Sequence, residues 1–100
     1  MSLEDVTAQI EQKMTRAAGL RARVKFDFGD DGMIYVDTTC DPPEISHEDK
    51  EADTVLSCQL DVFTGFLTGT QDPNIAFMMG KLKVRGSMGL AMKLNSILED

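Results

Sequence analysis

Glycines and cations lie close together near the C-terminal end of this chain, in a pattern that could bind phosphate. The segment MMGKLKVRGSMGLAMKL, residues 78–94, contains three glycines, four methionines and four cations. A P-loop needs G-x-x-x-x-G-K-[ST], but Leu82 follows Lys81, and Ile75 stands where the first glycine is required. The stretch RGSMG supplies only the last half of a dinucleotide fingerprint. Both nucleotide motifs therefore fail. An anion at the backbone amides after Ser87 remains as an alternative to plain helix capping by that serine.

The stretch DFGDDG, residues 27–32, is similar to the start of a calcium loop. Asp27, Asp31 and Gly32 match positions 1, 5 and 6 of such a loop. Gly29 falls at position 3, and Thr38 falls at position 12, where a bidentate glutamate is required. A hairpin turn is the favoured interpretation, and we predict no metal site.

The histidine and the two cysteines form no catalytic or zinc-binding pattern. Cys40, His47 and Cys58 lack a zinc spacing and supply only three ligands. Nucleophilic catalysis would need His47 to meet Cys40, Cys58 or a serine in space, and no local pattern supports that. We expect a loop thiol at Cys40, a small core residue at Cys58 and no disulfide. The sequence predicts no catalytic residue and no cofactor.

Hydrophobic periodicity predicts the elements that position these segments. The helix pattern of residues 2–18, capped by Ser2 with Asp5, stops at Gly19. Alternation then predicts a hairpin, and the acidic loop after it has room for at most a short edge strand. The remaining predictions are strands over 22–28, 33–39, 54–58 and 81–85, and helices over 60–68, 73–79 (capped by Asp72) and 88–98. This order predicts an α+β fold, with a mainly antiparallel sheet covered by helices on one face.

Charge is segregated along the chain and excludes one class of partner. The net charge of −7 argues against nucleic acid, which needs a basic surface. Residues 27–72 contain twelve acids and one cation, whereas the four cations of residues 81–93 have no acid among them. A basic segment of this kind is either a solvated face or the contact for an anionic headgroup or lipid surface.

Composition favours one globular domain over residues 1–100. Hydrophobic residues make up 42% of the chain, and no apolar run approaches the length of a membrane span. The acidic start MSLEDV is unlike a signal peptide, and SILED is no targeting signal. We expect a cytoplasmic protein without a transmembrane segment, for which transient membrane contact and oligomeric state stay open.

Methionines and phenylalanines gather in the last forty residues. Each could be an ordinary core residue, but methionine packs loosely and suits a surface that adapts to varied shapes. Short helices joined by glycines would form a loose lid. Apolar-ligand binding is therefore one hypothesis from the residues alone, beside an ordinary core.

The segment AFMMGKLKVRGSMGLAMKL resembles the C-terminal signature of the sterol carrier protein type 2 domain family. Similarity extends upstream through FLTGTQDPNIAF, EDKEAD and VKFDFGDDGMIYVD, so it covers nearly the whole chain, and the length and acidic loop look like those of stand-alone bacterial members. The resemblance implies a five-stranded sheet with helices enclosing a hydrophobic tunnel. It also implies non-catalytic binding of a fatty acid, acyl-CoA, phospholipid, isoprenoid or sterol.

The resemblance further implies which residues hold the lipid. The lining would consist of Phe63, Phe66, Leu67, Phe77, Met78, Leu82, Met88, Ala91 and Met92. Candidate headgroup contacts are Lys81, Lys83, Arg85 and Lys93, although those on the strand alternate with Leu82 and Val84 and so could point away.

Two other hypotheses stay open. In the first, the wide apolar band of the last helix is a protein-interaction face of an accessory module. In the second, a hydrolase or isomerase uses Asp27, Asp37 or His47.

Overall fold

The structure, a computed structural model, describes residues 2–15, 20–40 and 42–99, with only the backbone described at residue 99. In chain order the elements are α1 (Leu3–Met14), β1 (Arg23–Asp27), a 3₁₀ turn (Gly29–Asp31), β2 (Met33–Asp37), β3 (Glu44–Ser46), β4 (Thr54–Ser57), α2 (Leu60–Thr68), α3 (Pro73–Met78), β5 (Lys83–Gly86) and α4 (Met88–Glu99). Among the described residues, no helix has both the length and the apolar character to cross a membrane.

The five strands form one open sheet in the order β3-β2-β1-β4-β5. Three strand pairs are antiparallel, including the predicted hairpin of β1 with β2. The central pair, β1 with β4, is parallel, so the sheet is mixed. The α+β prediction with a mainly antiparallel sheet is confirmed. The predicted short edge strand is β3, at the opposite edge from β5.

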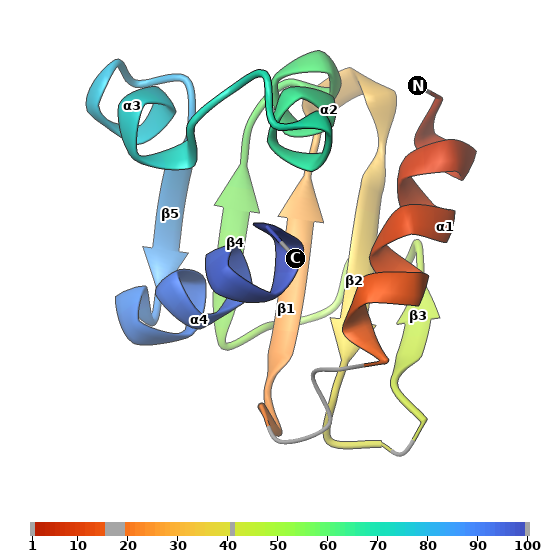
Figure 1. Ribbon diagram of the computed structural model, residues 1–100. Helices are drawn as coiled ribbons and strands as arrows, with labels where there is room; N and C mark the ends of the chain where they lie inside the picture. Colours follow the sequence, from red (N-terminus) through yellow and green to blue (C-terminus); the bar gives the residue numbers. More distant parts are fainter. Residues whose placement is uncertain (1, 16–19, 41, 100) are drawn as a thin grey trace.

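The helices cover one face and one end of the sheet (Figure 1). Helices α1 and α4 lie in front of the strands, and α2 and α3 lie at the end where β4 finishes and β5 begins. Alternation along the strands directs Val24, Phe26 and Leu56 into the core between sheet and helices. Helix α1 adds Val6, Ile10 and Met14, which are fully buried.

Local capping explains where α1 and α3 begin. Ser2 and Asp5 form the predicted capping box at α1. The hydrogen bonds that Ser2 donates to the Asp5 carboxylate hold the pKa of Asp5 below its ordinary value. Asp72 accepts a hydrogen bond from the Asn74 amide at 2.8 Å. The predicted end of the first helix, residues 16–19, lies outside the described residues.

Gly86 fixes the edge strand to its neighbour. Its φ is +86°, and a Cβ at this position would lie 2.3 Å from the Asp53 carbonyl oxygen. Only glycine permits this approach. The amide of Ser87 then donates to the same carbonyl at 3.1 Å. The junction between β5 and α4 is therefore set against the start of β4.

Candidate functional site: an apolar pocket beside a polar one

An apolar pocket of about 260 Å³ lies between the sheet, α2, α3 and α4. Leu56 of β4 and Val84 of β5 form its sheet wall, together with Leu82 just before β5. The helices supply the rest of the lining, which consists of Phe63, Phe66, Pro73, Asn74, Phe77, Met88, Ala91, Met92, Asn95 and Leu98. This lining has no charged side chain among the described residues, so the pocket suits an uncharged apolar group.

The floor of the apolar pocket is buried and packed with aromatic rings, and its rim is exposed. Phe63 is 1% exposed, and its ring lies 5.3 Å from those of Phe26 and Phe28 and 5.9 Å from that of Phe66, measured between centroids. At the rim, Phe77, Met88 and Met92 are each 45% exposed or more. The pocket thus joins a packed aromatic floor to flexible side chains at the surface.

Seven of the nine residues predicted to line a tunnel line this pocket. They are Phe63, Phe66, Phe77, Leu82, Met88, Ala91 and Met92. The other two lie elsewhere: Leu67 packs against the core, and Met78 is 84% exposed on α3. Met78 follows Phe77 directly, so it points about 100° round the helix from the lining stripe.

The four candidate headgroup cations are exposed and do not line the apolar pocket. Lys83 and Arg85 alternate with Val84 on β5, so their side chains leave the opposite face of the sheet. Lys81 and Lys83 instead line a second pocket. Arg85 and Lys93 line neither.

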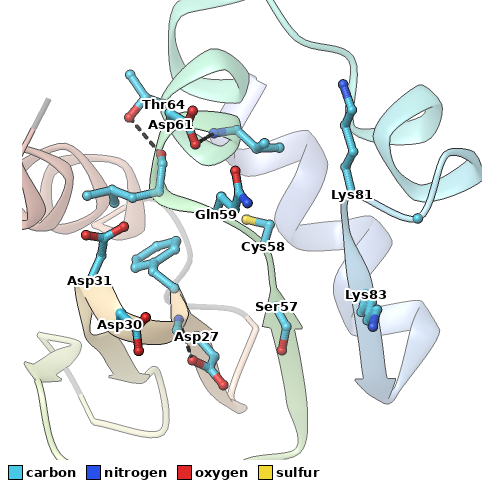
Figure 2. Close-up of a pocket in the computed structure, with 15 residues that line it drawn as sticks. Asp27, Asp30, Asp31, Ser57, Cys58, Gln59, Asp61, Thr64, Lys81 and Lys83 are labelled. Carbon is cyan, nitrogen blue, oxygen red and sulfur yellow. Dashed lines mark hydrogen bonds between the residues drawn. The ribbon is translucent and has the colours of Figure 1, made fainter.

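This second pocket is larger, about 1130 Å³, and polar (Figure 2). Asp27, Asp30 and Asp31 lie on one side of it, and Lys81 and Lys83 lie across from them. The remaining lining residues are Phe28, Gly29, Ser57, Cys58, Gln59, Leu60, Asp61, Val62, Thr64 and Gly80. Among the described residues, no three His, Cys, Asp or Glu side chains are grouped to hold a metal ion.

Cys58 lies between these two sets of charges (Figure 2). Burial raises the pKa of its thiol to about 12, and the negative charges of Asp61 and Asp27 add to the effect. The thiol is therefore protonated near neutral pH and is a poor nucleophile. Both cysteines are free.

The three residues of the enzyme hypothesis lie apart. Asp27 lines the polar pocket, where its carboxylate accepts from the Gly29 amide. Asp37 lines a separate pocket of about 300 Å³ on the sheet, and hydrogen bonds from Thr39 hold its pKa below the ordinary value. His47 is exposed, and its Nε2 lies 3.1 Å from the hydroxyl of Thr7. The described pockets do not bring these side chains together.

Six lining residues of the apolar pocket were missed by the sequence predictions, namely Leu56, Pro73, Asn74, Val84, Asn95 and Leu98. Helical and strand periodicity could have found four of them. Val84 follows Leu82 by two residues, so both side chains lie on the same face of the strand. Asn74 lies about one helical turn before Phe77. Asn95 and Leu98 follow Ala91 at helical spacings of four and three residues. Leu56 carries no such signal, because its place depends on the parallel pairing of β4 with β1.

Fold and pocket define a class: a small α+β protein with an apolar pocket between an open sheet and its helices. The chain belongs to the SCP-2 sterol transfer family, whose model matches residues 3–99. Sterol carrier protein 2 of Homo sapiens is 42% identical over 53 residues, which are 53% of this chain and 10% of that protein. The chain spans between 10% and 19% of the length of the curated relatives it matches.

Solved structures share the fold, among them two sterol carrier proteins. Sterol Carrier Protein 2 from Yarrowia lipolytica, in its apo form, has a TM-score of 0.68 and 25% identity, covering 95% of this chain and 77% of that chain. The solution structure of Sterol Carrier Protein-2 from Aedes aegypti, in complex with palmitate, has a TM-score of 0.79 and 20% identity, covering 98% of this chain and 96% of that one.

Proposed function

We propose that this protein is a non-catalytic lipid carrier that holds one aliphatic chain in the apolar pocket. The pocket itself carries the proposal, since its lining is uncharged and its rim consists of exposed phenylalanine and methionine side chains. Membership of the SCP-2 sterol transfer family supports it, as does the palmitate complex of the Aedes aegypti neighbour. The ligand classes remain those of the family: fatty acid, acyl-CoA, phospholipid, isoprenoid or sterol.

Binding would be driven by removing the chain from water, worth about 0.8 kcal/mol for each buried CH₂ group. The pocket, at about 260 Å³, lies just below the range of roughly 300–1,000 Å³ typical of ligand sites. A long chain must therefore displace side chains at the rim. Met88 and Met92, unbranched and exposed, can move at low cost.

The test begins with mass spectrometry of an organic extract of gently purified protein, which identifies any lipid retained. Uptake of a fluorescent fatty acid is then compared between two variants of α4. In Ala91→Phe, a ring replaces a buried methyl group of the lining. In Ser96→Phe, the same ring is added on the exposed side of the same helix.

We expect Ala91→Phe to weaken uptake by at least about tenfold, which corresponds to about 1.4 kcal/mol. Ser96→Phe should bind like the parent protein. Circular dichroism and thermal unfolding confirm that both variants fold. If the folded parent protein takes up no fatty acid and retains no lipid, the carrier proposal fails.

The exposure of Met88 and Met92 also favours a second candidate, a protein-interaction face on α4. In that case, a ligand-free protein would dimerise or bind another protein through this helix. Ser96→Phe would leave that association intact, and Met92→Ser would abolish it.

A further inference from the structure

Strand β5 lies at one edge of the sheet and has β4 as its only strand neighbour among the described residues (Figure 1). Helix α3 lies beyond one end of the strand, and the start of α4 lies beyond the other. Three of the four residues of β5 are exposed, Gly86 among them. An open edge strand of this kind is a template for pairing with another extended chain.

The backbone of Gly86 turns both of its hydrogen-bonding groups away from β4. The Arg85 carbonyl lies toward β4, where it accepts from the Thr54 hydroxyl at 3.1 Å. The Gly86 N–H therefore points to the opposite side, because the C=O and N–H of one trans peptide lie antiparallel. The Ser87 amide donates to the Asp53 carbonyl at 3.1 Å, so the Gly86 carbonyl also points outward.

Val84 presents the same pair of groups two residues earlier. Residues of an antiparallel strand alternate between those that bond to the neighbouring strand and those that face away from it. The N–H and C=O of Val84 therefore point outward with those of Gly86. Within residues 2–15, 20–40 and 42–99, no other segment bonds to these outward groups. The edge thus offers two donors and two acceptors at the spacing that a further antiparallel strand requires.

The side chains of β5 differ between its two faces. Val84 points to the helix side, where it lines the apolar pocket beside Phe77 and Met88 of the exposed rim. Lys83 and Arg85 leave the other face of the sheet. Lys83 borders the polar pocket, across from its carboxylates, whereas Arg85 lines neither pocket. No carboxylate in the described part of the chain forms an ion pair with Arg85.

A second copy of β5 is a poor partner for this edge. Antiparallel pairing of two copies about Val84 would place Lys83 opposite Arg85, and like charges directly opposite on two strands are destabilising. A strand with acidic side chains at these positions would be attracted instead. Between the acids, its apolar side chains would lie on the same face as Val84.

From these outward backbone groups and the side chains that alternate beside them, we infer that β5 binds an extended segment of another protein in which acidic and apolar residues alternate. The segment adds a strand antiparallel to β5. Its apolar side chains lie beside Val84 and the pocket rim, and its acidic side chains face Lys83 and Arg85. This inference does not depend on the carrier proposal, because backbone groups outside the pocket make the hydrogen bonds.

The experiment is a nuclear magnetic resonance titration of the isotope-labelled protein with the end-capped peptide EVEVEVE. We expect the amides of Val84 and Gly86 to shift and to exchange more slowly with solvent, because they gain acceptors. The amides of Lys83 and Arg85 face β4 already and should change less. The peptide KVKVKVK, with the same alternation and the opposite charge, is the matched control. It should bind this edge at least about tenfold more weakly.

Two modified peptides test the backbone bonds on the unaltered protein. In the antiparallel pair, the peptide valine opposite Val84 exchanges both backbone hydrogen bonds with it. N-methylation of the valines removes these donors and should weaken binding at least about tenfold. N-methylation of the glutamates changes amides that face away from β5, and should weaken binding by less than about threefold.

One protein variant tests the charge of the edge. Arg85→Glu should weaken EVEVEVE about fivefold and strengthen KVKVKVK by a similar factor, because it reverses a cross-strand charge pair. Lys50→Glu, in the loop between β3 and β4, is the control and should change neither affinity at β5. Circular dichroism confirms that both variants fold.

The inference is overturned if EVEVEVE leaves the Val84 and Gly86 amides unchanged, or if the two charge versions bind equally well. Equal losses on methylation of valines and of glutamates would also overturn it. So would a dimer, seen by sedimentation equilibrium, in which these two amides are protected without peptide, since a second copy would then occupy the edge. Peptide binding by a protein that takes up no fatty acid would reject the carrier proposal and keep the strand-pairing site.

Discussion

The two pockets share walls from the same elements, yet one is apolar and the other is charged. Helix α2 gives Phe63 and Phe66 to the apolar pocket, and Asp61 and Thr64 to the polar one. In the segment that leads into β5, Leu82 lines the apolar pocket and its neighbour Lys81 lines the polar pocket. A helix repeats every 3.6 residues and a strand every two, so one segment can line two different sites.

Size does not identify the ligand site in this molecule. The polar pocket is about four times larger than the apolar one, at about 1130 against 260 Å³. Its walls carry both signs of charge and are solvated. The apolar pocket is smaller, but there burial of a chain would release water from uncharged surface. The chemical character of the lining residues, and not the volume of the pocket, therefore identifies the candidate site.

The largest expected effect concerns the floor of the apolar pocket. Phe63→Ala should lower the free energy of unfolding by about 3–5 kcal/mol, since it removes a fully buried ring packed against three others. Thr64→Ala changes the next residue, which lines the polar pocket and donates to the Leu60 carbonyl. It should cost about 1 kcal/mol or less. Urea unfolding measures both, and equal losses would contradict the contrast between the two walls.

The next effect concerns the edge strand that separates the pockets. Gly86→Ala should destabilise the protein by about 2 kcal/mol or more, because the added Cβ meets the Asp53 carbonyl at a positive φ. Gly89→Ala, in α4, is the control: its Cβ would meet only the Ser87 hydroxyl, at 3.8 Å. That variant should be neutral or slightly stabilising, since alanine favours helix. A neutral Gly86→Ala would mean that β5 is not held as described.

A smaller effect is expected from the cations of the polar pocket. Lys81→Gln with Lys83→Gln should change palmitate affinity by less than about fivefold, because these side chains are exposed and do not line the apolar pocket. Hexadecanol, which lacks the carboxylate, is the matched ligand. A much larger loss for palmitate than for hexadecanol, measured by calorimetry, would place the headgroup among these lysines and join the two pockets into one site.

The smallest effect concerns the thiol of the polar pocket. The pKa of Cys58 is raised to about 12, so the folded state keeps a proton that the unfolded chain releases near pH 8.5. Its contribution to stability is therefore intact below that pH and is lost as pH rises toward 12. Native Cys58 should resist iodoacetamide at pH 8.5, whereas the urea-unfolded protein should react. Rapid alkylation of the native thiol, mapped by peptide mass spectrometry, would contradict this burial.

Local sequence pattern predicted much of the fold. The bounds predicted for α2, residues 60–68, are those observed, and serine caps α4 as expected, with the Leu90 amide donating to the Ser87 hydroxyl at 3.2 Å. These features depend on neighbours in the chain. The parallel pairing of β1 with β4 and the polar pocket depend on residues distant in sequence, which local periodicity does not show.

The same limit applies to the residues predicted to line a tunnel. Met78 was predicted to line a tunnel because the family segment contains it, whereas α3 turns it to the solvent. The resemblance also implies Leu67 as a lining residue, and in the structure Leu67 packs against the core. The ion pairs of Arg23, Lys25 and Lys50 also needed the structure, because the sequence shows cations without showing which of them meet acids.

The most direct test of the carrier account is the position of a bound chain, measured by intermolecular nuclear Overhauser effects between unlabelled palmitate and uniformly 13C-labelled protein. The account predicts contacts from the palmitate methylene protons to the Met88 and Met92 methyl groups and to the Phe63 ring, at one palmitate per protein. Met14, the buried last residue of α1, should show none. Contacts to Leu60 and Val62 of the polar pocket, without contacts to Met88 and Met92, would contradict it.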